Sequence, residues 1–457
     1  MAIEQRKDLE DLLVQCFESH SEGNCSSSHK PSEFDWNPSL HVKNVTRTIR
    51  TLQLDHSQRF WSLVSWIVGF MMILVIPILR LIYVKPADNE ASHQISEGKH
   101  QRTRVEQQDK GDIEPTSTVP VIQLVFQPFV VVIGILISSV SFIFFSQSTR
   151  KYGIQGILYL DMAAEETVYI REEYNKFIQR GATKLLKLFT PVLVLYILQK
   201  GWFYIDVPLA SLPHLNNRTA NIVIISMSEG ISWVYQTTTF LYACILFWKV
   251  CYLQELKMQL FKEMLLQAYD PELYYIKYTG IIKCLQSTSR RFRLFLALTG
   301  SITIFSALAS MYVVVKDRHG IGILLSGELV VLNLVNLTGI GLCLHSASKV
   351  AHLHRRIVKA ASSMHAKTTF ATSKCYISSQ WKDQSLEFEE KIQLFSQAQD
   401  AWSQRSALVN FISNNNAGIS VYGFVLDRFF VHTSIASVLT TMWFIVGQSL
   451  SSSQSNM

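Results

Sequence analysis

The chain reads AGISVYGFVLDRFFVHTSIASVLTTMWFIVGQ from Ala417 to Gln448, and this stretch decides how the rest of the sequence is interpreted. After Arg428, about 20 residues carry no Asp, Glu, Lys or Arg, which is the length an α-helix needs to cross the hydrocarbon core of a bilayer. Hydroxyl and amide side chains recur in it at three- and four-residue multiples, so they share one face of the helix. We therefore expect a membrane-spanning helix whose polar face is formed by Thr433, Ser437, Thr441 and Gln448.

The composition places the whole chain in a membrane. Apolar residues make up 48% of the sequence and charged residues 17%, and the apolar residues are gathered into long blocks. The net charge of +7 comes with basic residues that flank these blocks, which is typical of the cytosolic side of a membrane protein. A nucleic-acid partner is therefore not expected, and the lipid bilayer is.

The apolar blocks predict an all-α polytopic membrane protein with seven transmembrane helices. Six blocks precede the last one, at about residues 61–83, 121–145, 186–207, 225–252, 294–315 and 321–345. Asp270-Pro271-Glu272 predicts the start of a new helix, because Asp caps the first amides and Pro suits the first turn. An amphipathic helix with Phe388 and Trp402 at heptad-like spacing is expected up to Asn414 and needs a helical partner.

These blocks divide the chain into seven parts. We expect a retained cytosolic N-terminal region without a signal peptide, two spans with a polar outer loop, spans three and four with cytosolic helices, and spans five and six. A cytosolic helical anchor, the seventh span and an outer tail follow. The ranges are 1–60, 61–145, 146–293, 294–345, 346–428, 429–449 and 450–457.

Basic residues predict the orientation. With the N-terminus inside, the four inner segments hold 32 Lys and Arg, against 8 in the three outer loops. Because Lys and Arg accumulate on the cytoplasmic side, the N-terminus is expected inside and the C-terminus outside. The protein is expected in the plasma membrane, with an internal membrane as the alternative, and the sequon at Asn217 lies in a short outer loop.

Ionisable residues inside spans are candidates for function, because each must be paired or hydrated in a bilayer. Glu229, Glu328 and Lys200 occupy such positions, and Asn336 lies on the same helical face as Glu328. We interpret Glu229, Glu328 and Asn336 either as ligand contacts in a pocket among the outer halves of the spans or as interhelical hydrogen bonds that fix packing. Arg80, near the outer end of the first span, is expected to reach the interface, with an anion or ligand contact as the alternative. The same pocket could be lined by aromatic residues at 202–204, Trp233, Tyr235 and Phe240, although interfacial aromatic belts explain most of them.

Other patterns favour a structural interpretation. The pairs Gly320-Ile321-Gly322 and Gly339-Ile340-Gly341 lie at the edge of and within an apolar block, where small residues let helices approach closely rather than bind a dinucleotide. Cys244 and Cys251 read as small buried hydrophobic residues. The histidines have no acidic or cysteine partner at ligand spacing and are expected on a solvated or headgroup face; they are His345, His352 and His354. We expect neither a metal nor a cofactor, and no enzymatic activity.

The polar face of the last span has two interpretations. Its hydroxyls can bond back to their own helix or pack against neighbouring helices. Alternatively, Thr433, Ser437, Thr441 and Gln448 line a hydrated lane, with Phe444 and neighbouring Trp443 as a constriction. One helix cannot enclose a lane, so a channel would need several copies around an axis.

The end of the last span resembles the insect gustatory and odorant receptor superfamily. The signature of that superfamily is threonine, tyrosine, five mostly apolar residues, glutamine and phenylalanine; Thr441 and Gln448 match it, whereas Met442 and Ser449 depart from it. The approach from Gly418 to Arg428, followed by Thr433, is more similar to the plant gustatory-receptor-like branch.

The resemblance implies a homotetrameric, ligand-gated, cation-conducting channel. Its central pore would be lined by the last span, each subunit would hold an outer pocket for a small-molecule ligand, and inner helix extensions would form the cytosolic anchor. The alternatives are a small-molecule carrier, which would show repeats and broken spans, and a membrane scaffold without transport activity. A G-protein-coupled receptor would need the opposite orientation.

Overall fold

The computed structural model describes residues 59–83, 119–157, 170, 172–174, 176–177, 189–200, 218–267, 271–316, 322–382, 388–415 and 417–454. Most of the expected N-terminal region, the charged loop near residue 100, the aromatic residues at 202–204 and the sequon lie outside these residues. The side chain of Gln448 is also outside the described part of the chain.

Long helices make up the described part of the chain, as the apolar blocks predict. The first span is formed by α3 (Arg59–Phe70), a π-helix η1 (Met71–Val75) and α4 (Ile76–Tyr83). It is followed by α6 (Val119–Ile157), an unlabelled helix at Phe189–Lys200, α9 (Arg218–Gln267), α10 (Pro271–Lys316), α11 (Gly322–Lys382), α12 (Phe388–Asn414) and α13 (Arg428–Gln454).

Four helical segments of the described residues are long and apolar enough to cross a bilayer. They are Ser62–Ile82, Pro128–Lys151, Pro271–Tyr312 and Gly327–Ala371, and Phe189–Lys200 is a shorter apolar helix. The prediction of an all-α integral membrane protein with several long apolar helices is thereby confirmed. The fourth and seventh predicted spans form continuous helices, α9 and α13, that are not among these four; the count of seven spans and their orientation stay predictions.

The core lies where α9 packs against α11, with α6 and α10 alongside. Gly339 of α11 is at the closest approach, since a Cβ atom there would come within 2.7 Å of the Phe240 ring of α9. Gly341, two residues on, has open space in the same position. The expectation that small residues let helices approach therefore applies to the first of the two glycines.

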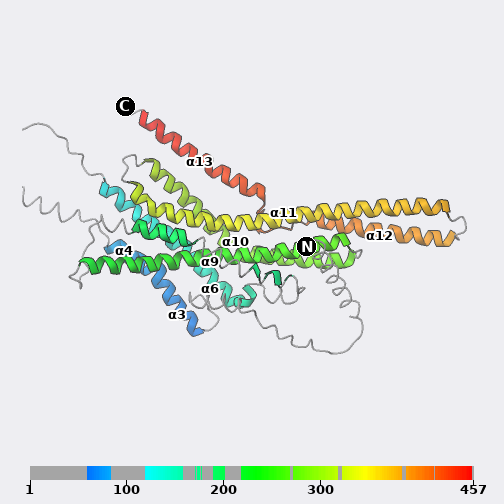
Figure 1. The fold of residues 1–457 in the computed structure, drawn as a ribbon, viewed down its shortest axis with the longest axis horizontal. Coiled ribbons are helices and arrows are strands. Elements are labelled where there is room, and N and C mark those ends of the chain that lie inside the picture. Colours follow the sequence, from blue (N-terminus) through cyan, green and yellow to red (C-terminus); the bar gives the residue numbers. More distant parts are fainter. Residues whose placement is uncertain are drawn as a thin grey trace, which may run out of the picture.

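Two parts of the chain extend beyond this core. α12 packs against α11, which gives the predicted amphipathic helix its helical partner, and Figure 1 shows the two helices running side by side to one end of the molecule. At the other end α13 diverges from the remaining helices toward the C-terminus (Figure 1).

A short β-hairpin, which the all-helical prediction missed, joins α12 to α13. Strands β1 (Ser420–Val421) and β2 (Phe424–Val425) pair antiparallel. The two residues of the turn, Tyr422 and Gly423, have positive φ angles of 49° and 90°. Such angles at both central residues are those of the tight turns that suit two-residue hairpins.

Candidate functional site

Four charged side chains from four helices meet in the interior. Arg80 of α4 lies 2.7 Å from Glu229 of α9 and 2.8 Å from Glu328 of α11, and its two terminal nitrogens contact the two oxygens of Glu328 in a bidentate pair. Lys200 lies 2.6 Å from Glu229 and 2.7 Å from Glu328. No side chain of this set is more than 11% exposed. We call Arg80, Lys200, Glu229 and Glu328 the charged quartet.

The quartet forms because the two helices that carry its basic residues run antiparallel to the two that carry its acidic residues. Arg80 and Lys200 are near the C-terminal ends of their helices, whereas Glu229 and Glu328 are near the N-terminal ends of theirs. Antiparallel packing brings these ends to one level. Two positive and two negative charges then balance, which is what allows four ions to be buried together.

The quartet corrects the expectation for Arg80. Its side chain does not reach for the interface but is buried and paired, with only 6% of the residue exposed. Its partners are Glu229 and Glu328, which also pair with Lys200; all three were singled out as ionisable residues inside spans.

Hydrogen bonds between α9 and η1 hold the first span beside α9, where its Arg80 reaches the quartet. Ser232 of α9 donates its hydroxyl to the carbonyl oxygen of Met72 at 2.5 Å, and the Gln236 amide lies 3.4 Å from the carbonyl oxygen of Ile73. Both carbonyls belong to η1. Since a π-helix bonds i to i+5, it disturbs the α-helical ladder, and neighbouring side chains bond to the backbone there.

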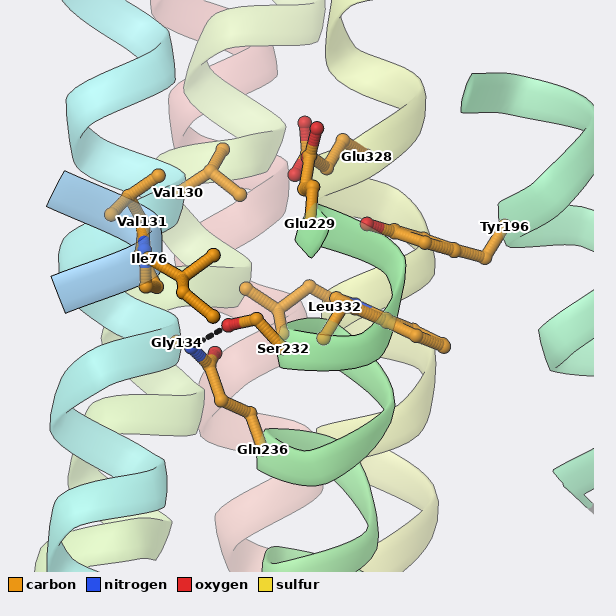
Figure 2. Close-up of a pocket in the computed structure, with 12 residues that line it drawn as sticks. Ile76, Val130, Val131, Gly134, Tyr196, Glu229, Ser232, Gln236, Glu328 and Leu332 are labelled. Atoms are coloured by element: carbon orange, nitrogen blue, oxygen red, sulfur yellow. Dashed lines mark hydrogen bonds between the residues drawn. The ribbon is translucent and has the colours of Figure 1, made fainter. Parts of the chain in front are cut away.

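A small pocket adjoins the quartet. Figure 2 shows the carboxylates of Glu229 and Glu328 side by side at one end of it, with the Tyr196 hydroxyl pointing toward them and Gln236 at the other end. The cavity has a volume of about 40 Å³, which is room for about three waters. Its lining consists of Ile76, Pro77, Val130, Val131, Gly134, Tyr196, Glu229, Ser232, Trp233, Gln236, Glu328 and Leu332.

Aromatic stacking forms one wall of this pocket. The rings of Tyr196 and Trp233 stack with centroids 3.8 Å apart, and the Lys200 ammonium lies 5.7 Å from the Tyr196 ring centroid. Of the aromatic residues proposed for the pocket, the structure places Trp233 in its lining, whereas Tyr235 and Phe240 belong to the main core.

Asn336 is buried but stands apart from the quartet. It lies one turn beyond the pocket-lining Leu332 on α11, and its amide nitrogen has no hydrogen-bond partner among the described residues. The neighbouring Asn333 behaves differently, because its amide contacts the hydroxyl and the carbonyl oxygen of Ser306 at 2.5 and 3.3 Å. Asn333 thus fixes packing between α10 and α11.

The predicted polar face of α13 is exposed. Thr433, Ser437 and Thr441 are all exposed, and the Thr441 hydroxyl donates to the Ser437 carbonyl oxygen at 2.9 Å. Phe444 is exposed as well, and Trp443 is 80% exposed. The Thr441 hydroxyl therefore bonds within its own helix, as one interpretation expects. No described residue covers the polar face of α13.

The residues set aside as structural are mostly in structural positions. Cys244 and Cys251 are buried free thiols, as expected. His345 is exposed, but His354 corrects the expectation of a solvated face, because it is buried with its Nδ1 3.2 Å from the Tyr278 hydroxyl. In the described part of the chain, no three His, Cys, Asp or Glu side chains gather in a way that could hold a metal ion.

Comparison with known proteins gives one family and a set of structures. Residues 116–436, more than half of the chain, match the model of a family described as "Protein of unknown function (DUF3537)". The sequence matches none of the curated proteins compared with it.

The similar solved structures include the insect olfactory receptor OR5 from Machilis hrabei in complex with eugenol. That structure has 12% identity and a TM-score of 0.48, and the match covers 89% of this chain and 99% of the receptor chain. A second structure of the insect olfactory receptor OR5 from Machilis hrabei has 12% identity and a TM-score of 0.49. That match covers 89% of this chain and 98% of the receptor chain.

Proposed function

The chain belongs to the DUF3537 family of proteins of unknown function, and we propose that it is a ligand-gated, cation-conducting channel of the gustatory-receptor-like type. Four copies would surround one pore, with the N-terminus of each inside and the C-terminus outside, in the plasma membrane. The motif at Thr441 and Gln448 and the approach from Gly418 to Arg428, which resemble that branch, support the proposal.

The observation that carries the proposal is the uncovered state of α13. This helix packs against α10 and α11, and Phe430 near its start joins the core, but large apolar side chains further along it are exposed. In a monomer this helix would turn its hydroxyl face as well as its apolar face toward lipid. Several copies around an axis would cover the apolar face and enclose the hydroxyl face.

In that assembly the polar face would line the lane. Thr433, Ser437, Thr441 and Gln448 would supply oxygen atoms for a hydrated cation, and Phe444 would form an apolar constriction that gates by dewetting. The anchor at residues 346–428, in which α12 packs against α11, would hold the copies together on the cytosolic side.

The pocket beside the charged quartet is the proposed ligand site, with Glu229 and Glu328 in its wall and Asn336 one turn beyond it. A ligand can open the pore if it binds the open arrangement of the helices more tightly than the closed one. Because the pocket lies between α4, α6, the helix at Phe189–Lys200, α9 and α11, helix movements would change its shape. The charges of the quartet cancel, so the site suits a small neutral molecule that accepts or donates one or two hydrogen bonds.

Single-channel recording tests the pore. The purified chain in planar bilayers should show unitary currents in the presence of an activating compound, and Thr441→Val should change their amplitude. Thr440→Val is a matched control, since Thr440 is also exposed and bonds back to its own helix at Ala436 but points about 100° away. Silence across a broad panel of small molecules would contradict the proposal and favour a carrier or a scaffold.

Glycan mapping tests the orientation. Acceptor sites introduced before Trp61 and after Gln448 should be modified only at the second position. Modification at the first position would reverse the topology and remove the basis for a cytosolic anchor.

A further inference from the structure

The β-hairpin lies far along α11 from the charged quartet. Along α11, 23 residues separate Glu328 of the quartet from Ala351, whose Cβ lies close to Gly418 at the base of the hairpin. At 1.5 Å per residue this is about 35 Å of helix, slightly more than the thickness of the hydrocarbon core. The sixth span is expected to end at residue 345 and the seventh to begin at Phe429, so the hairpin at residues 420–425 falls at the headgroup level of the leaflet on that side.

The hairpin is held rigidly in that position. The backbone amide of Ser420 donates to the hydroxyl of Ser289 on α10 at 3.0 Å. Within the hairpin, the amide of Leu426 donates to the carbonyl oxygen of Ile419 at 2.9 Å. Asp427 caps α13 at the amide of Phe430 and forms an ion pair with Arg355 of α11. Side chains on the hairpin tip are thus fixed relative to α10 and α11.

Large aromatic side chains project from this rigid element. Tyr422 is 59% exposed, Phe424 67% and Phe429, at the start of α13, 75%. Exposure of three aromatic residues within eight positions is costly in water, and aromatic rings are favoured at the level of lipid headgroups.

Basic side chains surround the aromatic ones. The exposed Arg293 lies over the Tyr422 ring at 5.6 Å, and the exposed Arg356 and Arg428 directly follow the two residues of the Arg355–Asp427 ion pair. The ion pairs of the described residues give this region one acidic partner, Asp427, which is taken by Arg355. We call Arg293, Arg356, Arg428, Tyr422, Phe424 and Phe429 the hairpin patch.

We propose that the hairpin patch binds the headgroups of anionic phospholipids in the leaflet on its side of the membrane. The arginines pair with headgroup phosphates while the aromatic rings lie between the headgroups and the acyl chains. The excess of basic residues on this side matches the anionic character of the cytoplasmic leaflet. The proposal rests on the contacts of the hairpin and does not require channel activity.

Lipid retention measured on the purified full-length chain tests the proposal. Protein reconstituted into nanodiscs of phosphatidylcholine with a minor fraction of phosphatidylserine is released and its bound lipids are quantified by native mass spectrometry. We expect enrichment of phosphatidylserine over phosphatidylcholine. Removing two charges with Arg356→Gln and Arg428→Gln should weaken phosphatidylserine retention by about 25-fold, since each basic residue near the surface contributes roughly fivefold.

Matched variants show whether the effect is local. Lys367→Gln with Lys374→Gln removes the same charge from exposed positions further along α11 and should leave retention unchanged. Phe424→Ser tests the aromatic tip with all charges kept and should also lower retention. If the Lys367 and Lys374 variant lost as much phosphatidylserine as the Arg356 and Arg428 variant, the effect would depend on net charge alone. That result would overturn the site.

Two further outcomes would overturn the proposal in other ways. Release of the lipid by inorganic phosphate would assign a soluble-anion site instead of a membrane contact. Disulfide cross-linking of Tyr422→Cys between two copies would show that a second chain covers the tip. A photoactivatable phosphatidylserine that labels residues 420–429, without such cross-links, is the result we expect.

Discussion

The charged quartet buries polar side chains in the interior, whereas α13 exposes apolar ones. Around the quartet, four ions are buried, and each is paired with two others across helices. On α13 the hydroxyls of Thr440 and Thr441 bond within their own helix, and apolar residues such as Trp443 and Phe444 are exposed. The first region is complete within one chain, whereas the described residues leave the second uncovered.

The difference separates what a single chain needs to fold from what it needs to act. Substitutions in the bundle should lower the stability of the monomer, because partners within the chain lose their contacts. Substitutions on the exposed part of α13 should leave that stability unchanged and alter association. Each of the following variants tests one side of this contrast.

Breaking the quartet should have the largest effect. Glu328→Gln leaves Arg80 and Lys200 to share Glu229, and breaking a buried ion pair costs about 3–5 kcal/mol of stability. Thermal unfolding in detergent measures the loss. Glu172→Gln, which removes an exposed partner of Lys176, should change stability by less than about 0.5 kcal/mol. A small loss at Glu328 would mean that the quartet is hydrated rather than locked.

Filling the close approach of α9 and α11 should have the next largest effect. Gly339→Ala places a methyl group against Phe240 and Cys244 in the core and should cost about 1–3 kcal/mol. Gly341→Ala, in open space on the same helix, should be neutral or stabilise by up to about 1 kcal/mol, since Ala is the better helix former. The same detergent assay compares the two, and equal effects would contradict the packing described.

Removing the crossing at η1 should have a smaller effect. Ser232→Ala deletes the hydrogen bond to Met72 between the first span and α9 and should cost about 1 kcal/mol. Ser228→Ala is its control, because that hydroxyl bonds to Ile225 within its own helix. The difference between the two unfolding midpoints isolates the interhelical bond.

Truncating α13 should have the smallest effect on the monomer. Trp443→Ala should change the unfolding free energy by less than about 0.5 kcal/mol, because the ring is exposed. Light scattering on the purified protein should show a smaller oligomeric fraction. A destabilised monomer with unchanged association would remove the contrast between α13 and the bundle.

The long helices and the ionisable candidates could be predicted from sequence, because their signals are local. Apolar blocks of spanning length and the restart at Pro271 correspond closely to the helices observed. Glu229, Glu328 and Lys200 stood out because charges are rare in apolar blocks.

Their pairing could not be predicted, since it depends on packing. Arg80 and Glu328 are 248 residues apart, and nothing near Arg80 indicates that its helix turns inward. The hairpin did carry a signal, a glycine between two β-branched strand residues at Val421 and Val425, but its strands have only two residues each. The pocket between the helices has no signature in any single stretch.

The π-helix at Met71–Val75 has a consequence for how the first span could have arisen. A π-turn accommodates one residue more than an α-turn, and every side chain beyond it is rotated by about 100° relative to an uninterrupted helix. Deleting one residue between Met71 and Val75 would keep the span long enough for the bilayer and keep its composition, yet it would turn Arg80 toward lipid. The phase of one helix, set by a single inserted residue, thus decides whether Glu229 and Glu328 are balanced by two positive charges or by Lys200 alone.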